Sequence, residues 1–131
     1  MTKTNLQHWH DYATTQNRAM LTAMLHDDAV FHSPVMHRPQ EGKALTAAYL
    51  AAATEVLFPA GFRYLREFDC GDRAVLEFQC ELDGITVNGV DMIEWDADGL
   101  ITDFKVMVRP AKALQVLQQK MAEMLARMGK G

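Results

Sequence analysis

The stretch FRYLREFDCGDRAVLEFQCELDGITVNGVDMIEWDADGLITDFKVMVR, residues 62–109, decides the fold class. Apolar and polar residues alternate through most of it, and short turns that contain Asp and Gly interrupt the alternation. Alternation is typical of half-buried strands, and such short turns join neighbouring strands as hairpins. The stretch therefore predicts an antiparallel meander, in which Gly89 indicates a bulge or a bend. The predicted strands are residues 62–69, 73–82, 85–96 and 100–109.

Helical patterns lie on both sides of the meander. Thr4 and Gln7 match a capping box at the start of a first helix, and Pro110 stands at the favoured first position of a last one. Two further helices are predicted at about residues 17–25 and at 43–58, and a short strand at 29–33 precedes a loop at 35–42.

This order of elements separates helices from strands, which is typical of the α+β class. The length of 131 residues fits one domain, residues 1–131. A long curved sheet wrapped around a helix forms a cone-shaped barrel, and its hollow is the natural place for a ligand.

Composition excludes several classes of partner. The net charge of -4 argues against nucleic acid and against an anionic membrane. No apolar run approaches the ~20 residues of a membrane span, and residues 1–12 do not resemble a signal peptide. Cys70 and Cys80 form no CxxC pair and suit a reducing interior, so we expect a cytoplasmic protein.

Asp91 is the most informative single residue. It stands in the apolar segment Val90–Trp95, where alternation places it on the same strand face as Ile93 and Trp95. A carboxylate on an apolar face must be paired, neutralised or used. A structural acid bonded to Arg or to backbone and a pocket residue are equally compatible with the pattern. If Asp91 is buried without a cation, its pKa rises and it can donate a hydrogen bond.

Three segments give the chain a resemblance to the nuclear transport factor 2-like (NTF2-like) superfamily and, within it, to the SnoaL-like group. They are Asp27–Pro34, Glu41–Lys43 and Val90–Phe104, and the likeness extends over residues 6–109. The resemblance implies a cone-shaped barrel with a curved mixed or antiparallel sheet, here with an extra C-terminal helix. It also implies that two copies could pair through the outer face of the sheet. The superfamily contains isomerases, hydratases, cyclases and dehydratases as well as binding domains, so the likeness does not specify a reaction.

Ketosteroid isomerases are distant members that the chain resembles in part. They use an Asp base before the proline that closes the first strand, and a first-helix Tyr and a protonated Asp that hold the enolate oxygen. Asp91 matches the protonated Asp, whereas Ser33 stands at the position of the base and Trp9 at that of the Tyr. Tyr12, one helical turn later, could replace the Tyr. A serine without an adjacent base is too weak to remove a carbon-bound proton.

His32 is the second candidate for acid–base chemistry, because histidine exchanges protons near pH 7. A pair of His32 and Asp91 could act as a base and the group that orients it. Strict alternation puts His32 and Ser33 on opposite faces, which favours a surface histidine instead. No His, Cys, Asp or Glu cluster has metal-binding spacing, and no cofactor is expected.

The sequence predicts an internal pocket for a small, mostly apolar molecule that bears an oxygen atom, with Asp91 as the recognition group. Two alternatives stay open: a cofactor-independent isomerase, hydratase or dehydratase that uses Asp91 and His32, and a non-catalytic dimeric interaction domain. The candidate pocket residues besides Asp91 are Trp9, Tyr12, Phe31, Ser33, Tyr49 and Phe78.

Overall fold

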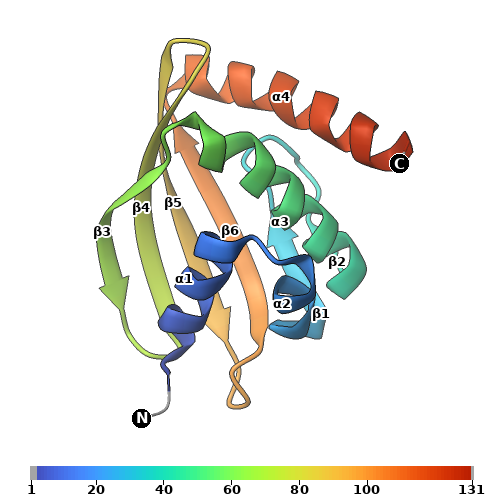
Figure 1. Ribbon diagram of the computed structural model, residues 1–131, viewed down its shortest axis with the longest axis vertical. Helices are drawn as coiled ribbons and strands as arrows, with labels where there is room; N and C mark the ends of the chain where they lie inside the picture. The colour runs from blue at the N-terminus through green and yellow to red at the C-terminus, as the bar shows by residue number, and fades with distance from the viewer. Residues whose placement is uncertain (1–2, 131) are drawn as a thin grey trace.

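A computed structural model describes residues 3–130, and these residues form an α+β fold. The elements are α1 (Asn5–Thr15), α2 (Arg18–Ala23), β1 (Leu25–His32), β2 (Gln40–Glu41), α3 (Lys43–Leu57), the 3-10 helix η1 (Phe58–Ala60), β3 (Arg63–Asp69), β4 (Arg73–Leu82), β5 (Ile85–Trp95), β6 (Ile101–Arg109) and α4 (Ala111–Lys130). The strands make one curved sheet in the order β2-β1-β6-β5-β4-β3 (Figure 1).

The predicted meander is confirmed. Strands β3, β4, β5 and β6 pair in sequence order, each antiparallel to the next, and β1 lies parallel to β6 on the far side. The sheet is therefore mixed. Its inner positions in β4 and β5 are buried and the intervening positions are not, as the alternation predicts.

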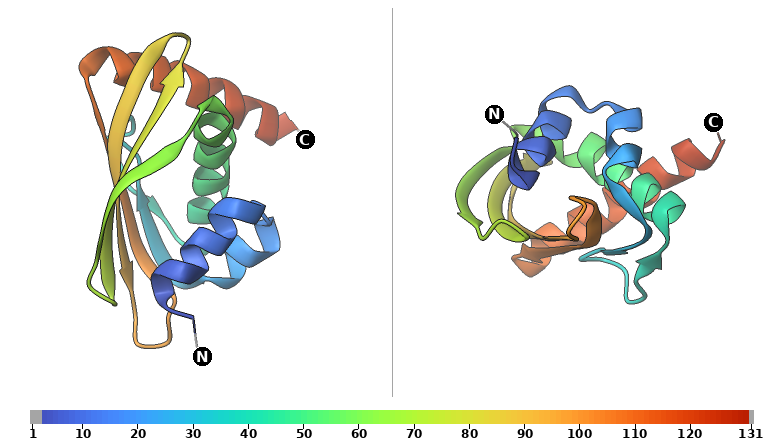
Figure 2. Two further views of the ribbon diagram at one scale, coloured as in Figure 1. Left: turned by 60° about the vertical axis from the view of Figure 1, so that its left-hand side comes forward. Right: turned by 90° about the horizontal axis from the view of Figure 1, so that it is seen from below.

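The helices lie on one side of the sheet. Figure 2 shows α1, α2 and α3 against the concave face, and α4 crossing one end of the molecule. The last helix buries Ala113, Leu117 and Met121 in the core and packs mainly on α3 and β5. None of the helices in residues 3–130 combines the length and the apolar character needed to cross a membrane.

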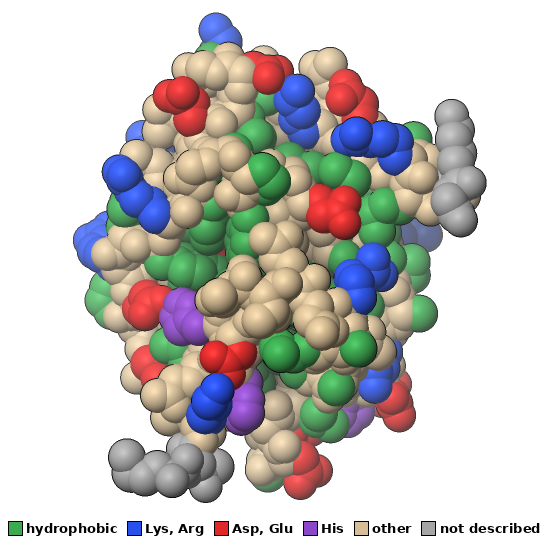
Figure 3. All heavy atoms as spheres, in the orientation of Figure 1, with side chains coloured by type: hydrophobic (Ala, Val, Ile, Leu, Met, Phe, Trp, Pro, Cys, Tyr) green, Lys and Arg blue, Asp and Glu red, His purple; other side chains and the backbone are tan. Residues whose placement is uncertain are grey.

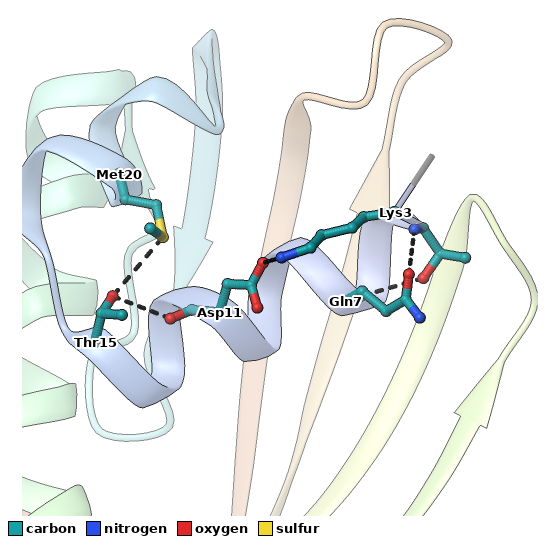
Figure 4. A network of polar contacts seen from close by, with 6 residues as sticks. Lys3, Gln7, Asp11, Thr15 and Met20 are labelled. Atoms are coloured by element: carbon teal, nitrogen blue, oxygen red, sulfur yellow. Dashed lines mark hydrogen bonds and ion pairs between the residues drawn. The ribbon is translucent and has the colours of Figure 1, made fainter. Parts of the chain in front are cut away.

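Helix α1 begins where the capping box predicts. The Thr4 hydroxyl accepts a hydrogen bond from the Gln7 amide, and the Gln7 side chain accepts one from the Thr4 amide. Lys3 and Asp11 form an ion pair at 2.6 Å along the exposed side of the helix (Figure 4). The opposite side buries Leu6, Trp9 and Tyr12, so capping and amphipathicity together orient the helix on the sheet.

Three local predictions were wrong. Strand β1 begins at Leu25, before the predicted start at residue 29, because Leu25 already pairs with Ile101 of β6; Asp27 and Asp28 lie where the register of β1 with β6 shifts. The predicted loop at 35–42 contains the short strand β2. Gly89 forms no bulge, because it lies in unbroken register with Phe78, and the register shift in β5 falls between Glu94 and Trp95.

Candidate functional site

Asp91 lies near the middle of the sheet and faces its concave side. Strand β5 has β4 and β6 as neighbours, and Asp91 pairs with Leu76 on one side and Val106 on the other. Its side chain is buried together with Ile93 and Trp95, so the predicted strand face is confirmed. It is the only buried Asp or Glu in the described part of the chain.

Tyr64 is the hydrogen-bond partner of Asp91. Its hydroxyl donates to one carboxyl oxygen of Asp91 at 2.8 Å and accepts a hydrogen bond from the indole Nε1 of Trp9 at 3.0 Å. The relay joins helix α1, strand β3 and strand β5. The second carboxyl oxygen of Asp91 accepts no hydrogen bond from residues 3–130. Within these residues, every side-chain nitrogen or oxygen that is fully buried has a hydrogen-bond partner, so this unpartnered oxygen is not fully buried. That oxygen is therefore open to the interior space.

The surroundings of Asp91 change its titration. Burial raises the pKa of Asp91 from 3.8 to about 7, and the hydrogen bond from Tyr64 opposes part of that rise. Asp91 forms no salt bridge within residues 3–130, so no cation offsets the loss of water. Burial and the nearby Asp91 charge raise the pKa of Tyr64 well above its usual value, and Tyr64 remains a neutral hydroxyl.

A cavity lies beside Asp91 between the sheet, α1, α3 and α4. Its volume is about 30 Å³, enough for one or two water molecules. Asp91 is the only ionisable residue in its lining. The other lining residues are Trp9, Phe31, Ser33, Pro34, Leu50, Ala53, Thr54, Leu57, Phe58, Phe62, Phe104, Val106, Leu117 and Met121. The site is thus a single carboxyl group, backed by a hydroxyl, in an apolar chamber.

Comparison with known proteins places this chain in a family. The profile of the SnoaL-like domain matches residues 6–104, most of the chain. The chain belongs to the SnoaL-like domain family. Among curated proteins, none matches at a significant level.

Solved structures resemble this SnoaL-like domain over nearly its whole length. A steroid delta-isomerase from Pseudomonas aeruginosa is 36% identical, with a TM-score of 0.90 over 97% of this chain and 93% of that one. An uncharacterised protein with a cystatin-like fold from Silicibacter pomeroyi is 29% identical, with a TM-score of 0.85 over 96% and 90%. A putative SnoaL-like polyketide cyclase from Jannaschia is 13% identical, with a TM-score of 0.66 over 87% and 91%, and shows the fold alone. The NTF2-like, cystatin-like fold is thereby confirmed.

The structure brings some of the candidate residues of this SnoaL-like domain together. Asp91, Trp9, Phe31 and Ser33 all line the cavity. The Ser33 hydroxyl accepts a hydrogen bond from the Val35 amide at 3.2 Å, so it acts within its own turn. Apart from Asp91, the cavity lining contains no ionisable residue that could act as a base for Ser33.

Other candidates lie outside the cavity lining. Tyr12 is buried, and its hydroxyl lies 3.3 Å from that of Thr54, so it does not reach Asp91. Tyr49 packs against Phe31 from α3, and Phe78 is buried beneath Phe62. These three residues support the walls of the cavity and do not form its surface.

His32 is not paired with Asp91. Its Nε2 lies 2.9 Å from a carboxyl oxygen of Asp103, which neighbours it on the parallel strand β6. Both side chains are half-exposed on the outer side of the sheet. Alternation explains this placement, because Phe31 takes the inner position of β1 and its neighbour must face outward.

Tyr64 is the residue that sequence reasoning missed. It follows Phe62 at the two-residue spacing of a strand face, and it pairs with Phe78 of β4. The same alternation that located Asp91 could have placed Phe62 and Tyr64 on the inner face. The hydrogen-bond partner of Tyr64, however, depends on how far the sheet curves, and the order of residues along the chain does not contain that information.

Proposed function

We propose that the cavity binds a small, mostly apolar molecule through an oxygen atom that contacts Asp91, and that lining side chains move apart to admit it, because the cavity itself has a volume of only about 30 Å³. One observation carries the proposal: a buried carboxyl group has one oxygen held by Tyr64 and the other directed to an apolar interior space. A purely structural acid is normally satisfied on both oxygens. Asp91 instead keeps hydrogen-bonding capacity for a group that enters the cavity.

The protonation state of Asp91 selects the chemistry of that group. With a pKa of about 7, Asp91 is mainly protonated below neutral pH and mainly ionised above it. The protonated form donates to a carbonyl oxygen, whereas the ionised form only accepts hydrogen bonds. A ketone should therefore bind best at acidic pH, and a hydroxyl compound should bind over a wider range.

The first test uses 2-acetylnaphthalene as a carbonyl probe and 2-ethylnaphthalene as its oxygen-free control, with calorimetric titration from pH 5 to pH 8. We expect tighter binding of the ketone at pH 5. Because only the protonated carboxyl donates, its affinity should fall about tenfold by pH 8, whereas that of the hydrocarbon should not change. Asp91→Asn keeps an N–H donor and should remove the pH dependence of ketone binding.

Asp91→Leu provides the opposing control, since it removes the hydrogen bond while it preserves an apolar lining. In this variant both probes should bind with equal affinity. Equal binding of ketone and hydrocarbon to the unaltered protein at pH 5 would contradict the proposal, as would failure of both to bind.

A second candidate function is proton transfer on such a ligand. Two observations favour it: the pKa of Asp91 is near neutrality, where a general acid–base group works best, and a protein 36% identical to this one is a steroid delta-isomerase. Asp91 would carry out the transfer as the sole ionisable group in the cavity lining, because His32 lies on the other face of the sheet.

Exchange of the methyl protons of 2-acetylnaphthalene for deuterium in D2O, followed by NMR, measures this step without a known substrate. Enzymatic proton removal should make the exchange faster than in buffer and dependent on the ionised form of Asp91. Asp91→Asn should abolish the acceleration while ketone binding remains. If saturating protein leaves the exchange rate the same as in buffer, proton transfer is ruled out and the protein is a binding domain only.

A further inference from the structure

A surface cleft adjoins the cavity on the side of β3. It occupies about 330 Å³ and is lined by His10, Ala13, Thr14, Gln16, Phe58, Phe62, Arg63 and Tyr64. In the space-filling view, hydrophobic side chains gather in a hollow between the helices and the β3 edge of the sheet (Figure 3). The cleft has far more room than the internal cavity, which has space for little more than water.

Two aromatic rings separate the cleft from the cavity. Phe58 and Phe62 line both spaces, and their ring centroids are 4.4 Å apart. Both rings are only partly buried and lie in the connection from α3 through η1 to β3. A phenylalanine ring has no hydrogen bond that holds its rotamer, so rotation about χ1 can join the two spaces without a change in the sheet.

Tyr64 extends from the cleft to the cavity. Its ring packs edge-on against Phe62 with centroids 5.0 Å apart, and against His10 with centroids 5.5 Å apart. Its hydroxyl reaches Asp91. A molecule that moves along this side chain from the cleft therefore arrives at the open oxygen of Asp91.

The cleft has an uncompensated positive charge. Arg63 is exposed and takes part in no ion pair within residues 3–130. His10, the other basic residue of the lining, is paired with Glu67 at 2.5 Å. The lining itself contains no acidic residue. An anionic group at the mouth would thus meet the guanidinium of Arg63. The neighbouring acidic side chains are Glu67, which is paired with His10, and Glu81, which lines an outer groove that Arg63 also borders.

We propose that the cleft is the outer half of the ligand site, and that the ligand is an amphipathic carboxylic acid. Its apolar body passes between Phe58 and Phe62, its oxygen contacts Asp91, and its carboxylate stays at Arg63. The inference rests on the proposed binding of an oxygen-bearing molecule at Asp91. It adds the class of ligand, the direction of entry and a residue that determines specificity.

The equilibrium test compares 2-acetylnaphthalene with 6-acetyl-2-naphthoic acid at pH 6, where the carboxylate of the second probe is ionised. The acid should bind about two- to fivefold more tightly, the range that an exposed ion pair supports. Arg63→Gln should remove this preference and leave the affinity for 2-acetylnaphthalene unchanged. Arg73→Gln is the matched control, because Arg73 is exposed and pairs with Glu94 away from the cleft.

The route of entry is tested by stopped-flow measurement of 2-acetylnaphthalene binding, with energy transfer from tryptophan as the signal. Phe58→Ala should raise the association rate severalfold, because it removes one of the two rings that separate the cleft from the cavity. Phe58→Leu serves if the alanine variant unfolds. Phe68→Ala, at an exposed phenylalanine outside both linings, should have no effect, and Met121→Ala tests entry from the side of α4.

The outcomes separate the two proposals. If 2-acetylnaphthalene binds through Asp91 but the acid gains nothing, or gains equally in Arg63→Gln, the outer half-site is wrong and the inner site stands. Faster entry in Met121→Ala with no change in Phe58→Ala would overturn the route. If 2-acetylnaphthalene does not bind at all, both proposals fail.

Discussion

A carboxyl group that loses water on folding and gains no cation keeps its proton to a higher pH than it does in the unfolded chain. Asp91 is in this position, with only the Tyr64 hydroxyl to stabilise its ionised form. The raised pKa suits Asp91 to bind a ligand oxygen, but it also means that ionisation of Asp91 above neutral pH destabilises the folded state. Function and stability therefore depend on one titration.

The sign of that dependence gives a prediction. Below about pH 4 Asp91 is protonated in both states; between pH 4 and 7 only the unfolded state loses the proton, so the free energy of unfolding falls as pH rises. Above pH 7 the loss is complete, at an upper limit on the order of 4 kcal/mol. Urea unfolding of the unaltered protein and of Asp91→Asn, at pH 4.5 and pH 8, measures it as the difference between the two proteins.

Tyr64→Phe refines this experiment. Without the hydroxyl, the ionised form of Asp91 loses its stabilising hydrogen bond, and the pKa of Asp91 should rise further. The pH window of the stability loss should then extend above 7. A constant difference between the unaltered protein and Asp91→Asn at all pH values would contradict the assigned environment of Asp91.

At the scale of elements, the packing at the centre of the sheet depends on Gly89 of β5, because neighbouring atoms lie where its side chain would be. Phe78 of β4 lies opposite Gly89, and a Cβ atom at Gly89 would come within 2.6 Å of the Phe78 ring and 2.4 Å of the Met107 carbonyl oxygen. Phe78 in turn stacks on Phe62 with ring centroids 5.1 Å apart. The absence of a side chain at Gly89 thus leaves room for Phe78, which in turn positions Phe62, one of the two rings between the cavity and the cleft.

Gly89→Ala should destabilise the protein by about 1–3 kcal/mol, because a methyl group must displace a packed ring and backbone. Urea unfolding with tryptophan fluorescence measures the change. Gly129→Ala is the matched control: nothing lies near its missing Cβ, and alanine suits a helix, so stability should not fall. A neutral Gly89→Ala would contradict the packing over β5.

At the scale of the whole molecule, the outer face of the sheet has no helix on it, whereas the concave face is covered (Figure 2). It exposes Phe68, Met92 and Met107, with 57%, 37% and 49% of their surfaces accessible. Ion pairs on the same face, such as Arg66 with Glu77, bring both signs of charge. We propose that a second copy of this chain covers the face, because a twofold axis can set opposite charges against each other.

Light scattering and sedimentation should then show a dimer at micromolar concentration. Met107→Glu places a charge in the apolar part of the face and should shift the protein toward monomer. Met36→Glu, at a similarly exposed methionine in the turn after β1, should leave the dimer intact. A monomer at all concentrations would remove the proposal.

The sequence by itself determined the elements of this protein and the face to which Asp91 belongs. Alternation, Asp/Gly turns and the Thr4 capping box are local signals, and each reports a backbone preference that folding keeps. For that reason the meander, the first helix and the burial of Asp91 agree with expectation. Where the local pattern and tertiary pairing differ, as at the start of β1, where Leu25 pairs with Ile101 of β6, tertiary pairing set the boundary.

Only the tertiary structure decided the partners of those residues. Tyr64 meets Asp91 across two strand-to-strand spacings and His32 meets Asp103, because the curvature of the sheet and the parallel register of β1 with β6 set these distances. The small cavity arises where side chains of α1, α3 and α4 pack against β1, β5 and β6, and the two rings that separate it from the cleft come from η1 and its connection to β3. The periodicity of the sequence indicates which face of an element a side chain occupies, but it does not indicate which residue from another element that side chain contacts.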